Sequence, residues 1–149
     1  MGVSVREAIA ADLPAVHAIA RAAYAPYVAR LGFEPPPMVQ DFAADLASGD
    51  LWVARGRGDL CGYVVFRRRE ADVYLDNVAV APDRHGRGVG RALIGHVEGR
   101  AAALGLPVLL HTNVVMTENL AIYPRLGYRE IDRRTEDGLH RVYFRKDPA

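Results

Sequence analysis

A glycine-rich turn carries the clearest chemical signal in the sequence. The hydrophobic segment Val78-Ala79-Val80-Ala81 leads into His85-Gly86-Arg87-Gly88-Val89-Gly90-Arg91, and an apolar helical pattern begins at once. Glycine lets a backbone adopt positive φ and approach a ligand closely. The first turn of a helix adds unpaired N–H groups and the positive end of the helix dipole. Together these features predict an anion site suited to a pyrophosphate, which Arg87 and Arg91 flank as phosphate partners.

Three other interpretations compete for this turn. A P-loop requires Gly-Lys-Ser/Thr, and the turn contains no lysine, which excludes that class. A dinucleotide-binding fingerprint requires Gly-x-Gly-x-x-Gly, whereas the spacing here is Gly86-x-Gly88-x-Gly90, late in the chain. Glycines that serve only a tight turn are the third alternative, although alternating glycines with flanking arginines exceed what such a turn requires.

The composition is that of an ordinary globular chain. Of its 149 residues, 50% are hydrophobic and 25% are charged, and the formal net charge is +1. No strong field therefore favours nucleic acid or an anionic membrane as a partner. The single cysteine, Cys61, excludes an intramolecular disulfide and is expected in the core. We find no signal peptide or membrane span, and we expect one cytoplasmic domain covering residues 1–149.

Strands and helices alternate around the turn. Strands are predicted at residues 3–8, 51–55, 60–68, 73–80, 107–111, 128–134 and 139–145, and the wholly apolar strand 107–111 is of the kind expected at a sheet centre. Helical spacing predicts helices at residues 12–27, 39–46, 88–104 and 118–126. A strand meander followed by a strand-helix-strand unit indicates an α/β or α+β three-layer fold around a mixed sheet.

Two motifs together resemble the GNAT family of N-acetyltransferases. The acyl-CoA motif of that family is Gln/Arg-x-x-Gly-x-Gly/Ala; Gly88 and Gly90 match it, and His85 stands where Gln or Arg is usual. The second motif is Asn119-Leu120-Ala121-Ile122-Tyr123-Pro124-Arg125-Leu126-Gly127-Tyr128. The resemblance covers nearly the whole chain. It implies a mixed, mostly antiparallel sheet of about seven strands flanked by about four helices, with a splayed parallel strand pair.

The same resemblance implies acetyl-CoA as co-substrate and no metal. In this family the pantetheine arm lies between the splayed strands, here residues 76–81 and 108–112, and the backbone of Val78, Ala79 and Val80 would orient the thioester. An amine then attacks directly, without a covalent enzyme intermediate. The family places a tyrosine general acid four residues before a Gly-Phe/Tyr pair, a spacing that Tyr123 matches. A core tyrosine with a satisfied hydroxyl is the alternative.

The sequence does not determine which group accepts the proton of the amine. Asp76 could remove it directly or through water, or could be a solvated or salt-bridged carboxylate. His111 is a second candidate because an unperturbed imidazole titrates near neutral pH, and many related enzymes use water chains. Met116 stands where the family often has an asparagine. Asn119, one helical turn before Tyr123, would contact the pantetheine or the phosphate arm, or cap the helix.

The expected acceptor is an amine-bearing small molecule or a peptide. Aromatic and apolar residues gather around the loop after the first helix: Tyr24, Tyr27, Phe33 and Met38. They could cover the acceptor or simply pack two helices on the sheet. An acyl-CoA-binding sensor, a catalytically inactive binding module and a nucleotide-binding domain of another family remain open alternatives. The sequence does not determine the oligomeric state, a homodimer included.

Overall fold

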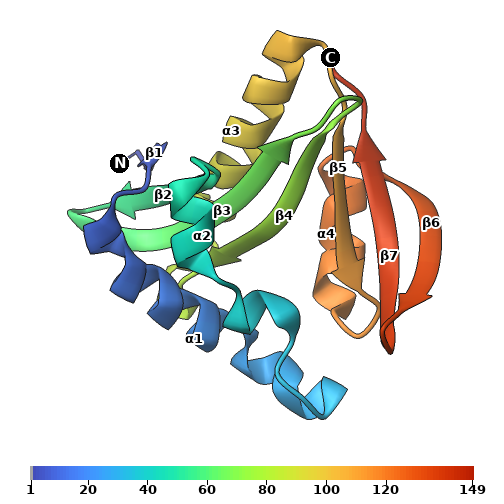
Figure 1. The fold of residues 1–149 in the computed structure, drawn as a ribbon, viewed down its shortest axis with the longest axis horizontal. Coiled ribbons are helices and arrows are strands. Elements are labelled where there is room, and N and C mark those ends of the chain that lie inside the picture. The colour runs from blue at the N-terminus through green and yellow to red at the C-terminus, as the bar shows by residue number, and fades with distance from the viewer. Residues whose placement is uncertain (1) are drawn as a thin grey trace. The chain divides into compact units, whose positions relative to one another are not determined.

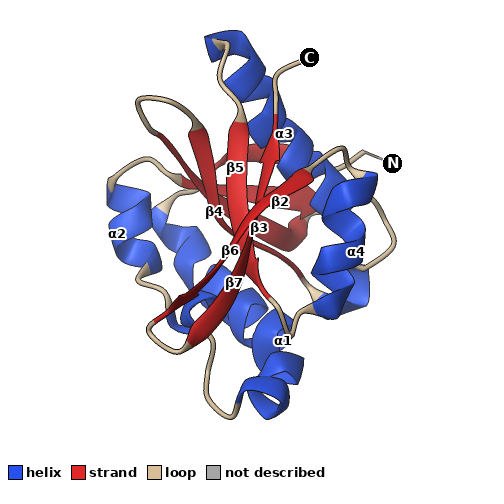
Figure 2. Ribbon diagram, turned by 90° about the vertical axis from the view of Figure 1, so that its right-hand side faces the viewer, coloured by secondary structure: helices blue, strands red, loops and turns tan. Residues whose placement is uncertain are grey.

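The computed structural model describes residues 2–149. Its strands form one seven-stranded sheet in the order β1-β2-β3-β4-β5-β7-β6 (Figure 1). The strands are β1 (Ser4–Glu7), β2 (Leu51–Gly56), β3 (Asp59–Arg68), β4 (Val73–Val80), β5 (Val108–Asn113), β6 (Arg129–Glu136) and β7 (Leu139–Lys146). The helices are α1 (Leu13–Leu31), α2 (Phe42–Ala47), α3 (Val89–Leu104) and α4 (Thr117–Arg125) (Figure 2). Short 3-10 turns cover η1 (Ala10–Asp12), η2 (Pro36–Val39) and η3 (Pro82–Arg84).

The predicted fold class is confirmed. The sheet is mixed, because β4 and β5 run parallel whereas β1–β2, β2–β3, β5–β7 and β6–β7 are antiparallel pairs. Two helix boundaries differ by three residues or more: α2 was expected from residue 39 but begins at Phe42, and α1 was expected to end near residue 27 but continues to Leu31 with Pro26 inside it. Gly32, at φ 83°, then ends the helix, since glycine takes the left-handed cap conformation without strain. None of the described helices is long and apolar enough to cross a membrane.

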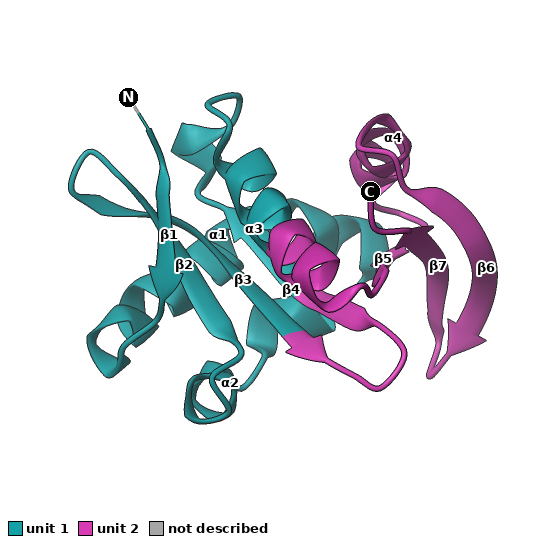
Figure 3. Ribbon diagram, turned by 90° about the horizontal axis from the view of Figure 1, so that it is seen from above, with its two compact units in different colours: residues 1–66, 77–96 teal, residues 67–76, 97–149 magenta. Residues whose placement is uncertain are grey.

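The chain divides into two compact units (Figure 3). Unit 1 comprises residues 1–66 and 77–96, and unit 2 comprises residues 67–76 and 97–149. The division falls inside β3, β4 and α3, so each of these elements contributes residues to both units.

In unit 1, one face of β3 packs against α2 through aromatic rings. Tyr63 is fully buried, and its ring meets that of Phe42 edge-on at 5.0 Å. Phe42 in turn meets the ring of His17 on α1 at 5.1 Å. Edge-to-face rings of this kind add to the stabilisation that burial alone provides. This cluster fixes the first two helices on the strand.

The opposite face of β3 meets the start of α3 at Gly62. A Cβ at Gly62 would lie 2.9 Å from the carbonyl oxygen of Ala79, 3.0 Å from Leu93 Cδ1 and 3.1 Å from Val89 Cγ1. Such contacts are too short for any other residue to fit without a shift of its neighbours. Glycine therefore lets α3 lie close on the strand that feeds the glycine-rich turn.

In unit 2, α4 covers one face of the strands. Leu110 of β5 faces Phe144 of β7, and the ring of Phe144 lies 5.7 Å from Tyr123 of α4. The next registered pair, His111 and Tyr143, points to the other face because successive strand side chains alternate. The sheet of unit 2 thus has one apolar face under α4 and one face that carries polar and aromatic groups.

The C-terminal end of α4 is closed by Lys146. Its Nζ donates to the carbonyl oxygen of Leu126 at 2.7 Å and forms an ion pair with Glu98 at 3.2 Å. Gly127 follows at φ 96°, a conformation that favours glycine. Cations are stabilising at a helix C-terminus because the last carbonyl groups lack partners.

Candidate active site

The glycine-rich turn lies wholly in unit 1 and has an open surface. Gly86 and Gly88 adopt φ of 76° and 81°, and a Cβ at either would have no neighbour within 4 Å. The backbone conformation, rather than packing, therefore requires glycine at these two positions. Gly90 has no positive φ, and its Cβ would meet Val80 Cγ2 at an ordinary 3.5 Å. Residue 90 therefore has room for the methyl group of an alanine.

The first turn of α3 offers backbone donors. Ala92 donates to the carbonyl oxygen of Gly88 at 3.0 Å. In an α-helix the N–H groups that precede the first such bond have no intrahelical acceptor, and these belong to Val89, Gly90 and Arg91. His85, Arg87 and Arg91 are exposed beside them. Donors, helix dipole and guanidinium groups together fit a pyrophosphate.

Arg84 links the glycine-rich turn to the β2–β3 hairpin through hydrogen bonds. It ends η3, and its Nη2 donates to both carboxylate oxygens of Asp59, at 2.7 and 2.9 Å. Its Nη1 donates to the carbonyl oxygen of Gly56 at 3.3 Å. Asp59 raises the pKa of Arg84, chiefly through the hydrogen bond. Sequence analysis missed this contact, because the partners are 25 residues apart and neither belongs to a motif.

The second half of β4 belongs to unit 1 and carries the three backbone positions predicted to orient the thioester. Ala79 is buried, whereas Val78 and Val80 are half-buried. The carbonyl oxygen of Val78 lies 3.0 Å from the hydroxyl of Tyr24, which donates to it. Asn77, just before Val78, is a buried polar residue that sequence analysis did not single out. Its polar type at a buried position of an alternating strand was the available signal.

The parallel ladder between β4 and β5 is short. It pairs Val73 with Val108, Tyr74 with Leu109 and Leu75 with Leu110. Asp76 and His111, the two base candidates, are the residues that directly follow the last registered pair in the two strands. Both lie in unit 2. The structure therefore brings the two predicted bases to one end of the same ladder.

Asp76 forms an ion pair. Its Oδ2 lies 2.9 Å from Arg67 Nη2, and its side chain is 27% exposed. This geometry is the salt-bridged carboxylate that sequence analysis gave as the alternative. A carboxylate held by a guanidinium still has lone pairs for a second partner, because an ionised carboxylate has about four acceptor positions.

His111 is held between two tyrosines. Its Nδ1 shares a hydrogen bond with the hydroxyl of Tyr74 on β4, and its ring lies 5.5 Å from that of Tyr143. Burial, followed by the positive charge of Arg141, lowers the pKa of His111 to about 4. The imidazole is therefore neutral at physiological pH and has one nitrogen free of a proton.

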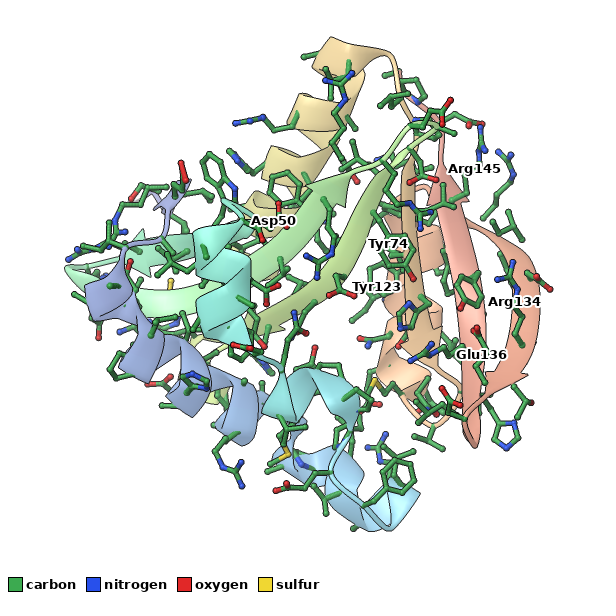
Figure 4. All side chains as sticks on the ribbon, viewed as in Figure 1. Asp50, Tyr74, Tyr123, Arg134, Glu136 and Arg145 are labelled. Carbon is green, nitrogen blue, oxygen red and sulfur yellow. The ribbon has the colours of Figure 1, made fainter. Side chains whose placement is uncertain are left out.

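Tyr123, the predicted acid, lies on the buried side of α4 (Figure 4). Its side chain is 6% exposed, and its ring packs against those of Tyr128 and Phe144, each at 5.7 Å. The hydroxyl of Tyr128 donates to Glu98 at 2.8 Å, and burial raises the pKa of Tyr128. Tyr128 thus has a packing role, while the catalytic role of Tyr123 stays a prediction.

The side-chain amide of Asn119 forms hydrogen bonds within unit 2. Its Nδ2 donates to Thr112 Oγ1 at 3.1 Å and lies 3.7 Å from Met116 Sδ. The alternative of helix capping does not hold, because Met116 occupies the N-cap position and Asn119 donates through its amide rather than accepting. Contact of Asn119 with the pantetheine or phosphate arm stays a prediction.

The four residues around the first loop have different environments. Tyr24 and Met38 are buried, as expected for packing, whereas Phe33 is 46% exposed. Tyr27 is half-buried, with the guanidinium of Arg30 5.0 Å from its ring centroid. Phe33 is therefore the member of this group with a large apolar surface on the outside.

The chain is similar to known proteins both in sequence profile and in fold. The profile of the acetyltransferase (GNAT) domain matches residues 47–130, more than half of the chain. The ribosomal-protein-S18-alanine N-acetyltransferase of Escherichia coli is 22% identical, with a TM-score of 0.77 over 99% of this chain and 95% of that chain. The PaiA N-acetyltransferase of Thermoplasma acidophilum, solved in complex with coenzyme A, is 14% identical, with a TM-score of 0.80 over 99% of both chains. A GNAT acetyltransferase from Streptococcus agalactiae is 18% identical, with a TM-score of 0.82 over 100% and 97%. No curated protein matches the chain.

The seven-stranded mixed sheet, its parallel β4–β5 pair and the glycine-rich turn define an α/β acyltransferase fold. The chain belongs to the GNAT family of acetyltransferases. Membership supports acetyl transfer as its general activity.

Proposed function

We propose that the chain is a single-domain, acetyl-CoA-dependent N-acetyltransferase that moves the acetyl group directly to a primary amine. The glycine-rich turn at the start of α3 is the observation that supports this most. Its backbone donors and its exposed arginines fit the two linked phosphates of coenzyme A. The coenzyme A complex of the structurally similar PaiA enzyme adds support for this ligand.

The reaction has a simple proton balance. A lysine-like ammonium has a pKa near ~10.4, so it must lose one proton before its nitrogen can attack the thioester carbonyl. The C–N bond then forms and the C–S bond breaks, and the nitrogen loses a second proton. The departing thiolate takes up one proton. No covalent bond to the protein is needed.

Three side chains are candidates for these proton transfers. Tyr123 is the proposed acid that protonates the thiolate, a role worth ~10²–10⁴-fold in rate. Asp76 is the proposed base for the amine, directly or through water. His111 is the second candidate for the base. Its pKa of about 4 keeps the imidazole neutral, but it also makes the imidazole a weak proton acceptor. Backbone groups of Val78, Ala79 and Val80 are proposed to orient the thioester carbonyl.

The acceptor is proposed to be a small molecule or a peptide with a primary amine. The Escherichia coli relative is named for the alanine of ribosomal protein S18, so a peptide with an N-terminal alanine is a reasonable first acceptor to test. Exposed Phe33 is a candidate contact for an apolar acceptor group. Amines, polyamines and aminoglycosides complete the panel, with thiol release as the readout.

A tyrosine substitution tests the proposal against the sensor alternative. Tyr123→Phe should lower kcat by a factor on the order of 10² or more, because only the hydroxyl is lost. Coenzyme A affinity, measured by calorimetry, should stay within about threefold. Tyr128→Phe is the matched control and should keep most of the turnover, since its hydroxyl is bonded to Glu98. A wild-type protein that binds coenzyme A but turns over no amine would support the sensor instead.

A further inference from the structure

A buried amide on β4 holds the loop between α1 and α2. Asn77 is 3% exposed and directly precedes Val78. Along β4, buried and half-buried side chains alternate, and Asn77 takes a buried position together with Val73, Leu75 and Ala79. A polar group at such a position must find partners inside the protein, because burying an amide without them costs free energy.

Every hydrogen-bonding capacity of the Asn77 amide is used. Its Oδ1 accepts from the hydroxyl of Tyr63 at 3.0 Å, and it shares the single hydroxyl proton of Tyr24, also at 3.0 Å, with the carbonyl oxygen of Val78. Its Nδ2 donates to the carbonyl oxygen of Pro37 at 3.1 Å and to Gln40 Oε1 at 2.9 Å. An asparagine amide has two acceptor lone pairs and two N–H donors. Its orientation is therefore fixed from both sides.

The carboxylate of Asp45 determines which groups donate and which accept along this chain of hydrogen bonds. Gln40 Nε2 donates to Asp45 Oδ2 at 2.7 Å, and Asp45 is 5% exposed. Because a carboxylate only accepts, Gln40 must turn its amide oxygen to Asn77, which then turns its own oxygen to the tyrosines. Burial raises the pKa of Tyr63, so its hydroxyl stays a donor.

The chain links the proposed acceptor loop to the proposed cofactor strand. Pro37 belongs to η2, Gln40 follows it, and both are held by Asn77. Tyr24 of α1 adds a second tie, because its hydroxyl lies 3.0 Å from the carbonyl oxygen of Val78 as well as from Asn77. All of these residues lie in unit 1.

We infer that Asn77 is a positioning residue that couples the order of residues 36–40 to cofactor binding on β4. The inference rests on the proposed function, which places the thioester on the backbone of Val78–Val80. A ligand there restrains β4, and the fixed amide transmits the restraint to Pro37 and Gln40. By linkage, an ordered loop strengthens cofactor binding by the same factor.

Amide hydrogen exchange of wild type and Gln40→Met, each with and without saturating coenzyme A, tests this coupling. The N–H groups of Met38 and Phe42 are suitable reporters, since they donate within the loop, to Pro35 at 2.9 Å and to Gln40 at 3.1 Å. Methionine keeps the side-chain length and removes both amide hydrogen bonds. Without ligand, we expect both reporters to exchange about tenfold faster in Gln40→Met. Coenzyme A should slow them in wild type and have little effect in the variant.

A matched control is Val39→Met, which changes an exposed residue of the same loop and leaves the hydrogen-bond chain intact. It should behave as wild type. Wild-type exchange rates in Gln40→Met, equal protection by coenzyme A in both proteins, or equally faster exchange throughout β5 would each overturn the inference. If the wild-type protein fails to bind coenzyme A in calorimetry, the proposed function is refuted instead. The comparison of wild type and Gln40→Met without ligand would then still test whether the hydrogen bonds of Gln40 order residues 36–40.

Discussion

The charge state of the His111 imidazole affects the stability of the protein in acid. Its folded pKa is about 4, below the ordinary 6.5, because burial disfavours the charged form. Between these two values the unfolded chain binds more protons than the folded one, so the free energy of unfolding falls as the pH falls from about 6.5 to about 4. At neutral pH the group is uncharged in both states and imposes no such penalty.

His111→Gln should therefore make the protein less sensitive to acid. We expect its melting temperature to fall less than that of wild type between pH 6.5 and pH 4, measured by circular dichroism in matched buffers. His140→Gln is the control, since His140 is exposed. Parallel pH profiles for His111→Gln and wild type would contradict this prediction.

The two glycines of the acyl-CoA motif are predicted to differ in their tolerance of alanine. Gly88→Ala should weaken coenzyme A binding about tenfold, because a left-handed conformation costs a non-glycine residue on the order of 1–2 kcal/mol. Gly90→Ala should change the affinity by less than about threefold, since its Cβ would make an ordinary 3.5 Å contact with Val80. Calorimetry of both variants measures the difference. Equal loss of affinity in the two would show that backbone conformation is not the reason for glycine at residue 88.

At the scale of elements, the ion pair between Arg84 and Asp59 links the glycine-rich turn to a hairpin. Arg84→Ala should weaken coenzyme A binding only about threefold, because solvent screens a partly exposed ion pair and keeps its contribution small. Asp59→Ala should have the same effect, and the double variant should be no worse than either single variant. Additive losses in the double variant would mean that the two side chains act independently on the turn.

The elements themselves were largely predictable, and the contacts between them were not. Helical spacing and glycine stops gave α3 and α4 to within a residue or two. The predicted end of α1 was wrong, because the helix continues past Pro26 to Leu31, where Gly32 caps it. The roles of Asn77 and Gly62 depend on partners from other elements, and neither has a local motif. The sequence alone indicates which side chains could take part in a reaction, but it does not indicate which residues of other elements position them.

At the scale of the whole molecule, we predict one cooperative unfolding transition. β3, β4 and α3 each contribute to both compact units, so neither unit is made of one continuous stretch of chain. Trp52 is the single tryptophan and lies in unit 1, with its ring 4.5 Å from that of His96. Its fluorescence reports on unit 1, whereas far-ultraviolet circular dichroism reports on all helices and strands. Coincident midpoints in urea would agree with a single domain, and an earlier fluorescence transition would contradict it.

The place of the one lysine side chain has a consequence for an enzyme that acetylates amines. Lys146 is the sole lysine in the sequence, and its ammonium is committed to Leu126 and Glu98 at the end of α4. Arginine, which carries all other side-chain positive charge apart from histidine, is not a primary amine. If the chain has the proposed function, its own side chains therefore offer a single primary amine to acetylate, and that amine is already engaged.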